Sequence, residues 1–236
     1  MLNYIRADLY RILSRPFPWL WFLIAAGFPA LAVLGMGKQY ELAQVLLGVQ
    51  VGIYIVFIFL SLILNEYTFR EDMQLGMLKN DTTSGISRGK LFMAKYLTGV
   101  FMEAVLWVAC SACAVIACGQ IFGTAHILSY WKTLFSVQAV SWLFNNLLFL
   151  ALLQVISIFV KKTSGLILVC LIVSTFVSRL GTLLSEALPG TEQAFTLPVT
   201  TGQPTVFQTV TALVCPLAGT AALCLAGCVL FRRSEF

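Results

Sequence analysis

Few residues of this sequence have the types and spacing that catalytic or metal sites need. The chain has one histidine, His126, so no His-based triad or metal cluster can be built within it. Cys110 and Cys113 have the spacing of redox and zinc motifs, but they lack a second pair and polar neighbours. All seven cysteines lie in apolar stretches, where cysteine behaves as a small hydrophobic residue. The sequence therefore predicts no metal site.

A glycine-rich stretch, residues 84–91, superficially resembles a phosphate-binding loop. Three residues separate its glycines where that loop needs four, and Leu91 stands where Ser or Thr would bind magnesium. The stretch also follows no predicted strand. The chain is therefore not expected to bind ATP by this route.

Glu103 is the one acidic residue inside a predicted membrane span. Ionisable groups in spans are costly and usually face the interior of the helix bundle. Two interpretations stay open: a structural ion pair near the membrane boundary, two turns beyond Lys95, or part of a solute path. Four amides of the fourth predicted span are expected to form hydrogen bonds between helices, and two of them, Asn145 and Asn146, are also candidates for that path. The four amides are Gln138, Asn145, Asn146 and Gln154.

These residues are set in a strongly apolar chain. Of its 236 residues, 59% are apolar and 11% charged, and the mean hydropathy is +0.91, whereas soluble domains carry roughly 25% charged residues. Uncharged stretches of ~20 residues can span a bilayer. Six are predicted, over residues 17–36, 42–64, 96–118, 133–160, 163–184 and 207–231. The sequence thus predicts an all-α, polytopic membrane protein with a single transmembrane domain over residues 1–236.

The charges predict the orientation in the membrane. With six spans, twelve of the 15 Lys and Arg residues fall on one side together with both termini, which marks that side as cytoplasmic. No run concentrates the net charge of +5, so contact with lipid headgroups explains it better than nucleic-acid binding.

The first 15 residues predict a basic amphipathic helix lying in the membrane interface. A signal peptide is the alternative, but the 21 uncharged residues 17–37 exceed a typical signal core of 7–15. The apolar arc of this helix is expected to lie on the membrane, opposite its charged face. The arc holds Leu2, Ile5, Leu9, Ile12 and Leu13, and the charged face holds Asp8, Arg11 and Arg15.

Residues 65–97 hold nine of the 25 charged residues of the chain. Within them, residues 66–78 predict a short cytoplasmic helix lying across the base of the bundle. Turn chemistry follows over residues 79–85, and a helix is expected to restart near Ser87. Such a polar platform between two spans is where a soluble partner would bind. Phe69 and Met73 are the expected apolar anchors, with Leu78 as a further candidate. Arg70, Glu71 and Asp72 are expected to form a charged rim.

Small residues four apart occur in two predicted spans. They are Gly48 and Gly52 in the second, and Ala218, Ala222 and Ala226 in the sixth. This spacing either lets helix backbones approach closely or reflects how common Gly and Ala are in membrane helices.

Four short stretches carry a family resemblance. They are residues 76–80, 85–88, 95–97 and 231–236, added to a basic amphipathic opening and an acidic cluster after the second span. Together they resemble the permease subunit of bacterial type-2 ABC exporters, especially the short permeases linked to bacitracin and lantibiotic self-protection. Met77 stands where many family members have Thr, which leaves the predicted helix unchanged.

The resemblance implies six transmembrane helices, an interfacial elbow helix over residues 2–15, and a coupling segment over residues 66–79 docking on a separate ABC ATPase. ATP and magnesium would bind to that ATPase, so this chain would be neither an enzyme nor a holder of cofactors. Two permeases, identical or different, would pair in the bacterial cell membrane and export or clear an amphipathic peptide or antibiotic. The expected coupling residues are Glu66, Phe69, Arg70, Glu71, Met73, Gly76, Lys79 and Arg88.

A stand-alone secondary transporter, or a membrane assembly subunit without an ATPase partner, is the alternative. A secondary transporter would be expected to show several intramembrane acids or internal repeats. The sequence has one such acid and no detectable repeat, and an ATPase gene beside this one would discriminate between the two functions.

Overall fold

The computed structural model describes residues 2–75, 86–124, 127–160, 165 and 206–233. Every regular element in these residues is helical. The elements are α1 (Leu2–Leu13), α2 (Pro16–Met36), the 3₁₀ turn η1 (Gly37–Gln39), α3 (Leu42–Asn65), the π-helical turn η2 (Glu66–Arg70), α4 (Glu71–Gln74), α6 (Arg88–Phe122), α7 (Ile127–Leu134), α8 (Val137–Phe159) and α11 (Val206–Arg233).

Five helical stretches in the described residues are long and apolar enough to cross a membrane. They are Pro18–Met36, Gln44–Gln74, Arg88–Phe122, Tyr130–Phe159 and Ala212–Arg233. The prediction of an all-α, polytopic membrane protein is confirmed. The fifth predicted span, residues 163–184, lies outside the described residues apart from Gly165.

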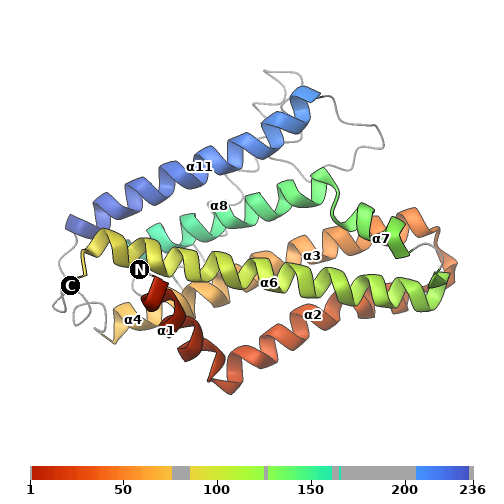
Figure 1. Ribbon diagram of the computed structural model, residues 1–236, viewed down its shortest axis with the longest axis horizontal. Coiled ribbons are helices and arrows are strands. Elements are labelled where there is room, and N and C mark those ends of the chain that lie inside the picture. The colour runs from red at the N-terminus through yellow and green to blue at the C-terminus, as the bar shows by residue number, and fades with distance from the viewer. Residues whose placement is uncertain (1, 76–85, 125–126, 161–164, 166–205, 234–236) are drawn as a thin grey trace.

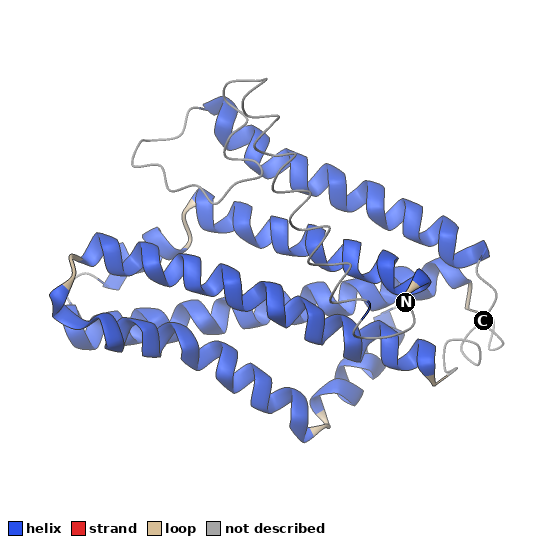
Figure 2. Ribbon diagram, turned by 180° about the vertical axis from the view of Figure 1, so that it is seen from behind, coloured by secondary structure: helices blue, strands red, loops and turns tan. Residues whose placement is uncertain are grey.

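The long helices form one bundle with α6 at its centre (Figure 1). Helix α6 packs against α1, α2, α3, α7, α8 and α11, and the view from behind shows α2 and α11 at opposite edges (Figure 2). Helix α1 and the end of α11 lie with α4 at one end of the bundle, here called the terminal end (Figure 1). The connection between α2 and α3 lies with α7 at the opposite, far end.

Helix α6 is longer than the predicted third span. Its 35 residues extend over roughly 52 Å, while the hydrocarbon core of a bilayer is about 30 Å thick. Because α6 starts at Arg88, Lys95 lies near its terminal end and Glu103 lies two residues from its midpoint. The position of Glu103 relative to the membrane boundary stays a prediction.

The helix that begins as α3 does not stop where the charges begin. Glu66 has helical backbone angles (φ −60°, ψ −50°), and its N–H donates to the carbonyls of Leu62 and Ile63. Residues from Glu66 to Gln74 continue the helix through η2 and α4, and the apolar stretch Gln44–Gln74 has 31 residues. Within its described residues, the predicted separate helix across the base is therefore an extension of the second span.

One further boundary and one helix face differ from the sequence prediction. The fourth predicted span corresponds to α8 but begins four residues later, because Ser136 caps the start of α8, where its hydroxyl accepts a hydrogen bond from Ala139 N at 3.4 Å. Helix α1 forms as predicted, but its charged face turns towards the protein: Asp8 is buried while Leu2 is 83% exposed. Ile12, expected on the membrane, is buried in the main hydrophobic core.

Candidate functional site

Four charged side chains from three elements meet at the terminal end of the bundle. We call Asp8 and Arg11 of α1, Asp72 of α4 and Lys95 of α6 the ion cluster. Lys95 Nζ lies 2.7 Å from both carboxylate oxygens of Asp8 and also pairs with Asp72. Arg11 Nη2 donates to Asp72 Oδ2 at 2.9 Å and lies 3.1 Å from Asp8 Oδ1. Two positive and two negative charges therefore balance one another.

Burial makes this balance energetically important. Asp8, Asp72 and Lys95 are 6%, 1% and 1% exposed, and only Arg11 reaches solvent, with a quarter of its side chain exposed. Buried charges are tolerated when they are paired, and removing one partner leaves an uncompensated charge. Lys95 also lies over the ring of Tyr4, 5.1 Å from its centroid. The ion cluster therefore links α1, α4 and α6.

The two members of the ion cluster on α1 have shifted pKa values. Burial raises the pKa of Asp8, and this effect outweighs the lowering by Lys95 and Arg11, while Asp72 raises it further. Burial lowers the pKa of Arg11, but its hydrogen bond and attraction to Asp72 outweigh that effect and leave the pKa raised. Arg11 thus remains a cation, whereas Asp8 binds a proton more readily than a solvated aspartate does.

Further ion pairs surround the ion cluster. Arg15 Nη1 donates to Glu71 Oε1 at 2.6 Å, which is a second link between the start of the chain and α4. Arg70 Nη1 lies 3.1 Å from Glu66 Oε2, one turn earlier in the same helix. Glu71 and Arg70, expected in a docking rim, are therefore engaged within the chain.

An aromatic cluster of Phe69, Phe92 and Phe231 lies next to the ion cluster. Ring centroids are 5.7 Å apart between Phe69 and Phe92 and 5.5 Å apart between Phe69 and Phe231. All three side chains are fully buried, and Met73 packs against them. Phe69 therefore faces the bundle and is not exposed as a docking anchor, because α6 and α11 cover it.

The surface that the segment does present lies at its tip. Gln74 is exposed and Leu75 is 60% exposed, whereas Arg70 is fully buried. Arg88 opens α6 and donates from Nη1 to the carbonyl of Arg232 at 3.5 Å. The expected coupling residues Gly76 and Lys79, and the further candidate anchor Leu78, lie outside the described residues.

Polar contacts continue into the centre of the bundle. Ser61 of α3 is hydrogen-bonded to Glu103 of α6, which is fully buried. Lys95 pairs with Asp8 and Asp72, so the expected structural ion pair of Glu103 is not formed within the described residues. Gln154 Nε2 donates to the carbonyl of Phe92 at 3.1 Å, which is the predicted kind of hydrogen bond between helices.

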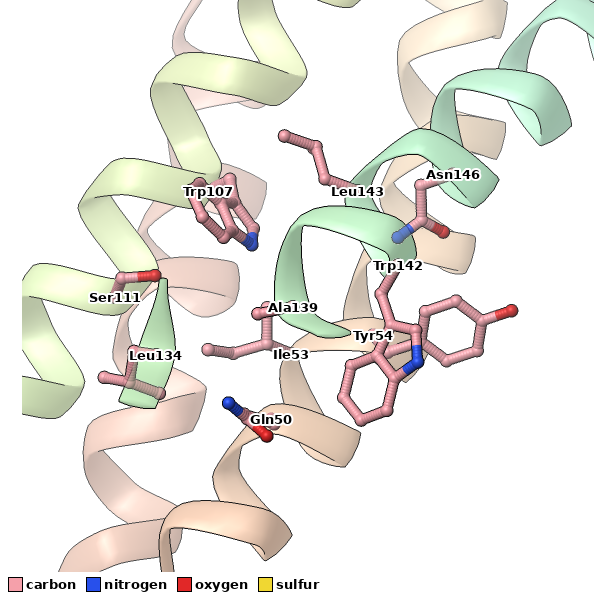
Figure 3. Close-up of a pocket in the computed structure, with 10 residues that line it drawn as sticks. All are labelled: Gln50, Ile53, Tyr54, Trp107, Ser111, Leu134, Ala139, Trp142, Leu143 and Asn146. Atoms are coloured by element: carbon pink, nitrogen blue, oxygen red, sulfur yellow. The ribbon is translucent and has the colours of Figure 1, made fainter. Parts of the chain in front are cut away.

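A small hollow lies between α3, α6, α7 and α8 (Figure 3). Trp107 and Trp142 flank it, and Ser111 and Asn146 add polar groups. Glu103 and Asn145 are not among the residues that line it. Of the three residues expected along a solute path, only Asn146 therefore lies at this hollow. In the described part of the chain, no group of His, Cys, Asp and Glu residues could hold a metal ion.

Sequence reasoning missed the ion cluster. It placed Asp8 and Arg11 on the face opposite the membrane-bound arc, Asp72 in a docking rim and Lys95 in the loop of residues 65–97. The available signal was complementary charge: acidic residues follow the second span, while a lysine stands within the apolar start of the third. A lysine flanked by buried neighbours needs a carboxylate partner, and that partner could have been sought on the first helix.

Comparison of the sequence with models of known protein families gives one match. The model of the ABC-2 family transporter proteins matches residues 12–179, which is more than half of the chain. The match runs from α1 through α8 and includes α4 and Lys95. No curated protein sequence matches the chain.

Proposed function

The chain belongs to the ABC-2 family of transporter proteins, and from this premise we propose that it exports, or clears from the membrane, an amphipathic peptide or antibiotic. Membership in the family makes it the membrane component of an ABC transporter and implies an ABC ATPase as its partner. ATP and magnesium would then bind to that ATPase. A second permease, identical or different, would complete the transport path in the bacterial cell membrane.

The charge distribution supports an orientation with the terminal end in the cytoplasm. With six spans, twelve of the 15 Lys and Arg residues lie on the side of the two termini. Helix α1, α4 and the end of α11 lie together at that end of the bundle (Figure 1). An ATPase would therefore approach the bundle from the side of α4.

The ion cluster is the observation that carries the proposal. A transporter driven from outside the membrane needs an element that an ATPase can move and that is firmly joined to the spans. The helix that ends in α4 is part of the second span, and Asp72 near its end is held by Arg11 and Lys95. A displacement applied at Leu75 would pass directly to α1, α3 and α6.

The docking anchor is assigned by exposure. Buried apolar anchors dominate the energy of protein interfaces, and Leu75 is the exposed large apolar side chain of the segment Glu66–Leu75 in the described residues. Leu75→Ala is therefore expected to weaken ATPase binding at least about fivefold, corresponding to a hot-spot loss above 1 kcal/mol. Gln74→Ala is the matched control, since Gln74 is the exposed polar neighbour.

The experiment is co-purification of the ABC ATPase with each tagged permease variant, combined with ATP turnover of the complex in lipid. Wild type and Gln74→Ala should retain the ATPase, while Leu75→Ala should lose most of it and remain folded. Equal retention by Leu75→Ala would refute the docking assignment. A wild-type permease that transports solute without any ATPase would instead favour a stand-alone secondary transporter.

A further inference from the structure

The contact between Glu103 and Ser61 lies at the centre of the bundle and has no role in the proposed ATPase coupling. Glu103 is two residues from the midpoint of α6, and Ser61 lies two residues from the midpoint of the stretch Gln44–Gln74. Both side chains are fully buried. The contact joins α3 to α6 inside the bundle, where an ionised group without a partner is costly.

Two oxygen atoms compete for the one proton of the Ser61 hydroxyl. Ser61 Oγ is 2.9 Å from the carbonyl of Phe57 and is also hydrogen-bonded to Glu103 Oε1. A serine hydroxyl has one proton to donate. If Ser61 gives it to the Phe57 carbonyl, then Glu103 must donate to Ser61, and only a protonated carboxyl group can do so.

The surroundings of Glu103 favour the same assignment. Its second oxygen, Oε2, has no hydrogen-bond partner among the described residues. Helices α2, α3 and α8 carry no Asp, Glu, Lys or Arg, and α11 carries only Arg232 and Arg233, at its terminal end. Helix α7 carries Lys132 at the far end of the bundle, and Lys95 of α6 is held by Asp8 and Asp72. Arg70 of η2 pairs with Glu66. Among the described residues, a carboxylate at this position would therefore be buried with a single hydrogen bond and no ion pair, which is very costly.

Two titratable neighbours share this face of α6, and neither supplies a charge. Tyr96 and Cys110 are each two turns from Glu103. The Tyr96 hydroxyl donates to the carbonyl of Leu147 at 3.2 Å, and Cys110 Sγ donates to the carbonyl of Ala25 at 3.3 Å. Both are therefore neutral donors turned towards other helices.

We propose that Glu103 is a proton-binding site at the centre of the membrane domain, and that its bound proton holds α6 against α3. With the proton in place, the chain of donors runs from Glu103 to Ser61 to the Phe57 carbonyl. Without it, Glu103 requires water or a cation, and its side chain is closed off from solvent while α3 and α6 are in contact. Release of the proton therefore accompanies separation of the two helices. This inference goes beyond the proposed function, because it depends on neither the solute nor the ATPase.

Infrared difference spectroscopy of the purified permease in lipid tests the protonation directly. At neutral pH, the wild type minus Glu103→Gln spectrum should contain the carbonyl band of a protonated carboxylic acid. Glu41→Gln, at the exposed start of α3, is the control and should remove only carboxylate bands. In Ser61→Ala the acid band should persist at a shifted frequency, because its hydrogen bond is lost.

The pH dependence of unfolding tests the coupling to helix packing. The unfolding temperature of the wild type should fall, relative to that of Glu103→Gln, as the pH is raised and Glu103 loses its proton. The curve of Glu41→Gln should follow the wild type. A wild type without an acid band, or with a curve parallel to that of Glu103→Gln, overturns the proposal. If Glu103→Gln cannot be purified, the infrared spectra of the wild type and Ser61→Ala test the proposal instead. The proposal is refuted if no acid band shifts between these two spectra.

Discussion

Replacing Lys95 with methionine tests the ion cluster at its centre. Methionine keeps a long, apolar stem but removes the ammonium group that lies 2.7 Å from both oxygens of Asp8 and also pairs with Asp72. The variant leaves two buried carboxylates facing Arg11 alone. One negative charge therefore remains uncompensated between α1, α4 and α6.

The size of the effect follows from burial. Breaking a buried ion pair by removing one partner costs about 3–5 kcal/mol, and Lys95 and Asp72 are each 1% exposed. Adding Asp8→Asn to Lys95→Met leaves Arg11 and Asp72 as a neutral pair. The double variant should therefore regain stability relative to the single one, with a coupling of roughly 2–3 kcal/mol.

Thermal unfolding of the purified permease in detergent, followed by tryptophan fluorescence, measures both effects. Lys90→Met is the matched control, because Lys90 is an exposed lysine on the same helix and surface changes usually stay within about 0.5 kcal/mol. Lys95→Met should unfold well below this control, and the double variant should lie between them. If Lys95→Met and Lys90→Met unfold at the same temperature, the ion cluster does not stabilise the terminal end.

Two further predictions concern the same end of the bundle. Because burial raises the pKa of Asp8, its contribution to stability is present at acidic pH and is lost as the pH rises through the folded pKa. In Asp8→Asn, the unfolding temperature should depend less on pH over this range. If it changes with pH as steeply as in the wild type, the prediction is contradicted. Gly227→Ala would place a Cβ 2.3 Å from Phe92 Cζ and should cost about 1–3 kcal/mol by overpacking. Ala226→Val, at an exposed neighbour, is its control, and equal unfolding temperatures would exclude the strain.

Five of the six predicted spans correspond to long helices in the described residues, but only some of their ends were predicted. Helices α2 and α11 begin and end within two residues of the predicted spans, because uncharged stretches bounded by charge define them. Helix α6 starts at Arg88, as the predicted helix restart near Ser87 indicated, and this start lies eight residues before the predicted span. A charged residue ends a span only if its charge must be hydrated. Lys95 instead forms ion pairs with two carboxylates, so the helix can carry it inside the protein.

The face of a helix that packs inward was also hard to predict. In α11 the alanines at positions 218, 222 and 226 are exposed, whereas Gly219 and Gly227 contact Leu148 and Phe92. Both sets have small side chains at helical spacing, so composition alone cannot choose between them. The choice depends on the large residues of α6 and α8 that face them, which are distant in sequence.

The buried face that begins in α3 explains why the coupling residues were misplaced. Phe57, Ser61, Asn65, Phe69 and Asp72 recur at steps of three or four residues and are all buried. This buried period continues past Asn65. The second span was predicted to end where the charged residues begin, but the helix continues for as long as the buried period does. The distance along this rod from Ser61 to Leu75 is roughly 21 Å.

A rod of this kind restricts the motions that a partner at Leu75 could drive. Moving α4 alone would break the ion cluster, at a cost of about 3–5 kcal/mol. Moving α1, α3 and α6 together keeps the pairs of Asp72 with Arg11 and Lys95 intact. Concerted movement is therefore favoured, and the contact between Ser61 and Glu103 can open only where α3 and α6 bend or slide beyond the ion cluster.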